Sequence, residues 1–231
     1  MKQKLILIPI FLLSIAISTQ AQKSRAIIRA GINSANITIT NDGDVDENNS
    51  LTSFQAGVIV DFPLASIISI QPGILFTGKG SKTEQGDPNG STWRRATTNP
   101  WYIEISVHVI FRTPTGDTRF FAGAGPYVAI GVAGKNDVEG KFFGVAFNSE
   151  NDIEWSNDDP FTTDYEEGAG YGIMKRFDYG LNGTIGIEMS KAVLSVNYGY
   201  GLAKIQSGTN QQQVDDKNKH RVLSVTLGIK L

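Results

Sequence analysis

The sequence has 231 residues, with 21 basic and 23 acidic side chains, two histidines and no cysteine. This length fits one sizeable domain, and the charge balance excludes the strongly basic surface that a nucleic-acid partner would require. Without thiols the chain has no disulfide framework, no thiolate metal site and no lipoprotein anchor.

The first residues have the layout of a secretory signal peptide. Lys2 and Lys4 precede an apolar core that is too short for a stop-transfer helix, and Ala21 stands at the small-residue position before a cut. We therefore predict a signal peptide over residues 1–21 and an exported domain over residues 22–231. The exported part carries 19 basic and 23 acidic residues, a net charge of about −4.

After the leader, apolar and polar residues alternate with a period of two, which is typical of β-strands. Near the C-terminus, for example, Leu223 and Val225 alternate with Ser224 and Thr226. Eight such strands are predicted, at residues 26–38, 53–63, 67–79, 101–112, 119–133, 176–189, 193–205 and 220–231.

The connections between these strands alternate between short and long. "PLAS", "TPTGD" and "SKA" are short, whereas the segments 39–52, 80–100, 134–175 and 206–219 are long. Long loops at one end and tight turns at the other predict an all-β fold. Specifically, we expect an eight-stranded antiparallel up-and-down transmembrane β-barrel with short periplasmic turns and long extracellular loops.

A soluble barrel such as a lipocalin would also alternate, but its polar face would be rich in lysine and glutamate. Here the polar face carries mainly Gly, Ser, Thr, Asn and Gln, which suit a narrow barrel interior. The stretch "FAGAGPYVAIGVAGK" fits this interpretation and not a nucleotide cradle, because Val128 replaces the third glycine and no helix is predicted to follow. Pro72 and Pro126 lack an amide hydrogen, so each predicts a bulge or a locally broken ladder.

Aromatic residues gather near the predicted strand ends, as in the two interfacial girdles of a membrane barrel. Trp101, Tyr102, Phe177, Tyr179, Tyr198 and Tyr200 lie toward the long loops, and Phe62, Phe111 and Phe120 lie toward the short turns.

The signal peptide together with "FQAGVIVDFPL", "SIQPGILFTGKG", "YIEISVHVIFR", "FDYGLNGTIGIEM" and the closing "VTLGIKL" resembles the PorT-like outer-membrane β-barrel proteins of the Bacteroidetes. The resemblance covers essentially all of the exported chain and implies a location in the cell outer membrane. The member that gives that family its name is tied to a secretion system. The chain departs from the usual terminal aromatic residue by ending in Leu231.

Several charged or titratable residues fall on the predicted inward face. They are Arg29, Asp61, Glu104, His108, Arg112 and Glu188, with Lys230 near the turn end. Unpaired charges in a narrow lumen would be costly, so we expect a structural network of pairs across the lumen. The alternative is a catalytic acid and base, which would also need a nucleophile and a path for substrate. We predict no catalytic residue, no cofactor and no metal site.

Two further motifs resemble functional sites but lack residues that such sites require. His220 could serve a lipid-modifying barrel enzyme, but Ser224 lies about 13 Å away along the strand, beyond hydrogen-bond reach. The acidic stretch "DGDVDENNS" begins like a calcium loop, yet Glu47 and Ser53 occupy the positions of the required glycine and glutamate. A solvated acidic loop is therefore the default interpretation.

The segment 134–175 is the most unusual loop, because it combines ten acidic residues with seven aromatic ones. We expect it to be partly ordered, by packing on itself or by extending strands above the membrane. It is the candidate site for an envelope protein partner or for lipopolysaccharide, besides the lipid around the barrel. The favoured function is a non-enzymatic, monomeric barrel that displays its loops over a largely filled lumen. The alternatives are an assembly component of an envelope or secretion machine and a lipid-modifying enzyme.

Overall fold

The computed structural model describes residues 24–38, 47–114, 116–157, 172–205 and 218–231. The predicted signal peptide and the aspartates of the "DGDVDENNS" stretch lie outside the described residues. Within the described part of the chain, no helix has the length and apolar character needed to cross a membrane.

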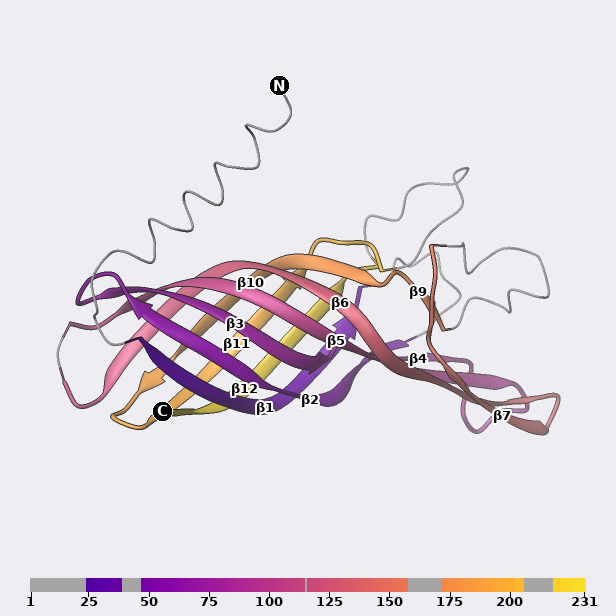
Figure 1. Cartoon of the computed structure of the whole chain (residues 1–231). Coiled ribbons are helices and arrows are strands. Elements are labelled where there is room, and N and C mark those ends of the chain that lie inside the picture. Colours follow the sequence, from indigo (N-terminus) through magenta and orange to yellow (C-terminus); the bar gives the residue numbers. More distant parts are fainter. Residues whose placement is uncertain (1–23, 39–46, 115, 158–171, 206–217) are drawn as a thin grey trace, which may run out of the picture.

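Eight antiparallel strands form a closed ring, which confirms the predicted fold class (Figure 1). They are β1 (Arg25–Ile37), β2 (Glu47–Pro63), β3 (Ile68–Gly78), β5 (Trp93–Arg112), β6 (Arg119–Phe142), β10 (Phe177–Glu188), β11 (Ala192–Gly201) and β12 (His220–Lys230). Strand β1 closes the ring on β12, in a register that runs from Ile27 opposite Lys230 to Ile37 opposite His220. Closure leaves the barrel without a free edge inside the membrane.

Alternate side chains point into the barrel and out of it, as the period of two predicted. On β5 the side chain of Val107 is 40% exposed, whereas those of its neighbours Ser106 and His108 are 1% and 4% exposed. The outward apolar row of β5 runs from Trp101 to Phe111. At about 3.3 Å per residue and a tilt of roughly 40°, ten residue steps span about 25 Å, the height of the apolar band of such barrels.

The two prolines interrupt the ladder on one side of their strands. The β2–β3 pairing skips Pro72, and the β5–β6 pairing skips Pro126; in both cases the register is the same before and after the gap. These gaps confirm the prediction of a locally broken ladder. Each proline removes one hydrogen-bond donor but adds no residue, so the register is unchanged. The register shift in β5–β6 lies elsewhere, between Trp101 and Tyr102.

Above the barrel the sheet continues as an extension, which is one of the two forms of order expected for the segment 134–175. The pairing of this segment with the loop 80–100 was not predicted. Strand β4 (Ser81–Gln85) pairs with the start of β2 and with β5, and β7 (Val145–Asp152) pairs with the far end of β6. Much of the predicted loops 80–100 and 134–175 is therefore strand. Figure 1 shows this extension projecting from the end of the barrel opposite the C-terminus.

Ion pairs across neighbouring strands accompany the extension. Arg95 on β5 pairs with Glu84 on β4 at 2.7 Å and with Glu139 on β6 at 3.0 Å. The hydrogen bonds from Arg95, foremost the one to Glu84, raise the pKa of its guanidinium. Lys135 on β6 pairs in the same way with Glu150 on β7. On the outward face of the extension, cross-strand ion pairs thus take the place of the apolar side chains that face lipid on the barrel.

One aromatic residue of the predicted girdles lies elsewhere. Tyr102 is fully buried inside the barrel, because it shares the inward face of β5 with Glu104. Its neighbour Trp101 faces outward, where its ring stacks on Phe76 at 5.0 Å and contacts Phe54 at 4.6 Å. The prediction of Tyr102 as a girdle residue was therefore wrong.

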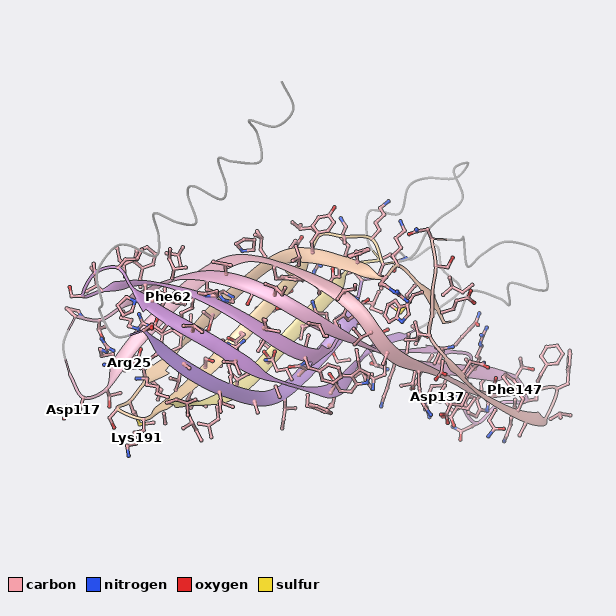
Figure 2. The ribbon with its side chains drawn as sticks, in the orientation of Figure 1. Arg25, Phe62, Asp117, Asp137, Phe147 and Lys191 are labelled. Carbon is pink, nitrogen blue, oxygen red and sulfur yellow. The ribbon has the colours of Figure 1, made fainter. Side chains whose placement is uncertain are left out.

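The barrel has a turn end, where the short connections lie, and a loop end, where the long ones lie. Figure 2 shows Arg25, Phe62, Asp117 and Lys191 around the turn end. Asp137 and Phe147 lie on the extension beyond the loop end. In outer-membrane barrels the long loops face the cell exterior.

Candidate functional site: the charged lumen

A turn-end ion cluster joins five strands inside the barrel. Arg112 on β5 donates to Asp61 on β2 at 2.7 Å and to Glu188 on β10 at 2.6 Å. Glu188 also accepts from Lys230 on β12 at 2.6 Å and from Arg119 on β6 at 2.8 Å. Asp61, Arg112 and Glu188 are each less than 10% exposed. Hydrogen bonds between charged partners of this kind are shorter and stronger than hydrogen bonds between neutral groups.

A second group of charges, the loop-end ion cluster, lies near the opposite mouth. The ammonium of Lys79, directly after β3, lies 2.7 Å from Glu104 on β5 and 2.9 Å from Asp178 on β10. The Tyr127 hydroxyl on β6 donates to the same Asp178 oxygen at 3.1 Å. The Lys79 ammonium also lies 3.9 Å from the centre of the Tyr127 ring. Asn182 donates to Glu104 at 2.7 Å, so the cluster is linked on several sides.

A hydrophobic cap covers this mouth. Strands β8 (Glu154–Trp155) and β9 (Ile173–Met174) pair in parallel above the loop-end ion cluster. Met174 packs in a cluster with Ile37, Ile153 and Ile205, and Trp155 contacts both this cluster and the Tyr102 ring below it. A Cβ atom on Gly131 would overlap the Trp155 ring, so the glycine allows this close approach.

His220 and Ser224 face the lumen but do not contact each other as a catalytic pair would. The ring of His220 is buried, and its Nε2 lies 3.2 Å from the hydroxyl of Tyr102. The Ser224 hydroxyl accepts a hydrogen bond from the Gln55 amide at 2.9 Å. Within the described chain, no group of three His, Cys, Asp or Glu side chains could hold a metal ion.

The middle of the lumen is narrow. Arg29 donates to the Asn197 side chain at 3.3 Å, and His108 is buried close to it. Arg29, His108 and Arg112 are among the residues that line a cavity of about 20 Å³, enough for about one water molecule.

The structure distributes the six inward residues singled out in the sequence over three places. Asp61, Arg112 and Glu188 share the turn-end ion cluster, Glu104 belongs to the loop-end ion cluster, and Arg29 and His108 lie between them. Lys79 and Asp178 were not among the residues predicted to form the lumen network. Both lie on the inward alternation of their segments, which is the signal that could have found them. The two clusters cross-link strands that are not neighbours in the sheet. Arg29 lies between them and donates to the neutral side chain of Asn197.

Comparison with known families identifies the class of protein. The profile of the outer membrane protein beta-barrel domain matches residues 20–207. The chain belongs to this family. As a member of the outer membrane protein beta-barrel family, it resides in the cell outer membrane. The match does not extend to the narrower PorT-like assignment, which stays a prediction.

Several solved structures are similar to this chain. Ail, the attachment invasion locus protein of Yersinia pestis, has a TM-score of 0.41 at 12% identity, with 91% of this chain and 100% of that chain covered. OprG of Pseudomonas aeruginosa has a TM-score of 0.42 at 14% identity, with coverage of 90% and 96%. Neisserial surface protein A has a TM-score of 0.39 at 11% identity, with coverage of 89% and 96%. No curated protein matches the chain.

Proposed function

We propose that this protein is a non-enzymatic outer-membrane barrel with a filled lumen, whose role is to display the sheet extension outside the cell. The observation that carries the proposal is the pair of buried ion clusters at the two ends of the lumen. Arg112 and Lys79 each contact two carboxylates from different strands. A solute pathway would have to pass both clusters.

Opening either cluster would be costly. Removal of one partner from a buried ion pair typically costs about 3–5 kcal/mol, because the other charge stays buried without compensation. At the loop end, the cap with Trp155 would have to move as well. The lumen is therefore suited to stabilising the barrel and not to passing solutes.

The buried partners of His220 and Ser224 also support a non-enzymatic role. A lipid-modifying enzyme needs its nucleophile and base within hydrogen-bond reach of each other and open to substrate. Here His220 is 1% exposed beneath the mouth, and Ser224 is 4% exposed. Both side chains contribute to the packing of the lumen.

The extension presents an apolar tip to the exterior. Phe142, Phe143 and Val145, at the turn between β6 and β7, are 62%, 79% and 71% exposed. The Gly144 amide donates to the Ser91 carbonyl at 2.7 Å, so the turn between β4 and β5 braces this tip. A braced, exposed aromatic tip suits contact with an envelope protein partner. It also favours the second candidate function, an assembly component of an envelope machine.

Conductance in planar bilayers tests the filled lumen. We expect no stable, large single-channel steps from the purified protein, because an eight-stranded barrel leaves room for little more than side chains. The double variant Lys79→Ala with Arg112→Ala removes both cluster centres and should produce measurable leak. Lys135→Ala, which removes an ion pair on the extension, is the matched control and should stay closed. Large, stable steps from the parent protein would contradict the proposal.

The assembly role is tested with the exposed tip. The double variant Phe142→Ser with Phe143→Ser should lose an envelope protein that co-purifies with the parent after cross-linking. Phe177→Ser, which changes an exposed aromatic residue on the barrel wall, should retain that protein. If the parent and the tip variant recover the same amount of this protein, the tip does not bind it, and the role as an assembly component is rejected.

A further inference from the structure

A pocket of about 440 Å³ opens on the outside of the barrel at its loop end. It is lined by Lys175, Phe177, Tyr179, Leu202, Ala203, Lys204 and Lys219. Within the described chain these residues come from three segments: the start of β10 with the lysine shortly before it, the residues directly after β11, and the residue directly before β12.

Backbone hydrogen bonds hold the three segments together. The Lys175 amide donates to the Ile205 carbonyl at 2.7 Å, and the Ile205 amide donates to the Asn218 carbonyl at 3.0 Å. The Leu202 amide donates to the Tyr179 carbonyl at 2.9 Å. The pairing of segments that are far apart in the sequence thus places the three lysines around one opening.

The pocket is positively charged. None of its lining residues is acidic, and in the described part of the chain Lys175, Lys204 and Lys219 take part in no ion pair. The neighbouring carboxylate of Asp178 points into the lumen, where it is bound by Lys79 and Tyr127. Among the described residues, no carboxylate neutralises these three ammonium groups, which suits them to binding an anion.

Beside the lysines lies a surface that faces lipid. Phe177 and Tyr179 are 69% and 54% exposed, and they continue the outward row of β10 that also holds Leu181 and Ile185. Aromatic residues at the end of such a row lie at the level of the lipid headgroups. A ligand that satisfies the whole pocket has an anionic head and apolar chains.

We propose that this pocket binds the phosphorylated headgroup of a lipid in the outer leaflet. Lysine ammonium groups recognise phosphate as compact point charges. The three lysines contact the phosphates, while Phe177, Tyr179 and Leu202 contact the upper acyl chains. Because the loop end faces the exterior, the ligand is the phosphorylated glycolipid anchor of lipopolysaccharide. This site does not depend on the proposed function, since a filled or an open lumen would leave it intact.

Titration of the detergent-solubilised, full-length mature protein with diphosphorylated lipid A tests the site, with bound lipid counted by native mass spectrometry. The triple variant Lys175→Gln, Lys204→Gln, Lys219→Gln should bind at least about tenfold more weakly, since each lysine near a lipid surface adds to the attraction. Dephosphorylated lipid A should show a similar loss with the parent protein. Heat-modifiable migration on gels checks that each variant is folded.

Two controls separate the proposal from its alternatives. The triple variant Lys82→Gln, Lys141→Gln, Lys191→Gln removes the same charge elsewhere and should bind like the parent. Tyr179→Ser should weaken lipid A binding without changing the charge, and inorganic phosphate should not displace the lipid. Parent-like binding by the pocket variant, an equal loss in the control variant, or displacement by inorganic phosphate alone would each overturn the proposal.

Discussion

Lys79 and Glu104 form a buried ion pair of 2.7 Å between the end of β3 and the middle of β5. The same ammonium contacts Asp178 on β10, which is not a neighbour of β5 in the sheet. The lysine therefore acts across the lumen as well as along the wall. Its ammonium also lies 5.6 Å from the centre of the Tyr102 ring, which in turn contacts Trp155 of the hydrophobic cap.

Lys79→Met is expected to destabilise the folded barrel by about 3–5 kcal/mol, because two buried carboxylates lose their cation. Reversible folding into lipid vesicles, followed by tryptophan emission against urea, measures this change. The triple variant Lys79→Met, Glu104→Gln, Asp178→Asn removes the charges together and should cost less than the single change. A single variant as stable as the parent would show that the pair contributes little.

Gly131→Ala is expected to displace the Trp155 ring, because the added methyl group would overlap it. In a background of Trp93→Phe and Trp101→Phe, Trp155 is the remaining tryptophan, and its emission should become more accessible to acrylamide. Gly183→Ala is the matched control, since nothing lies within 4 Å of the Cβ atom that it adds. Unchanged quenching in the Gly131 variant would contradict the contact between the cap and β6.

Phe143→Asn is expected to stabilise the turn between β6 and β7. Phe143 and Gly144 have φ values of 48° and 82°, the pattern of a hairpin turn that favours Asn-Gly. A bulky residue in this region costs about 1 kcal/mol, so amide exchange in β7 should slow by about fivefold. Phe142→Asn changes a neighbouring aromatic residue outside that region and should not slow exchange. Faster exchange in the Phe143 variant would mean that its ring stabilises the tip.

The eight barrel strands were predictable because lipid and lumen impose opposite chemistry on alternate residues. For the extension, the sequence predicted only partial order of the segment 134–175, because above the membrane the outward residues meet water and the apolar row ends: Arg95 and Glu139 stand where isoleucine and valine would stand in the barrel. The inward side chains of Asn136 and Val138 are still buried. Tyr102 was misassigned because tyrosine is common in aromatic girdles. Its place in the alternation of β5, two residues before Glu104, puts its side chain inside the barrel. Lys79 and Asp178 also lie at inward positions of the alternation. Their pairing could not be predicted because it depends on which strands face each other across the closed barrel.

Val107→Arg is expected to destabilise the barrel by about 2–4 kcal/mol, because Val107 faces lipid in the middle of β5 and an arginine there would meet hydrocarbon. Val107→Leu keeps the apolar character and should change the free energy of folding little. The measurement is again reversible folding into vesicles against urea, with both variants compared at the same lipid composition.

The adjacent residue Ser106 decides whether the faces are assigned correctly. Its side chain is 1% exposed in the lumen, so Ser106→Thr adds one methyl group there and keeps the hydroxyl. A shift of the register by one residue would exchange the environments of Ser106 and Val107 completely. If Val107→Arg folds as well as the parent while Ser106→Thr is strongly destabilised, β5 presents the opposite face to the lipid. Glu104 and Arg112 would then lie on the outside of the barrel, where they could not form the buried ion pairs of the two clusters.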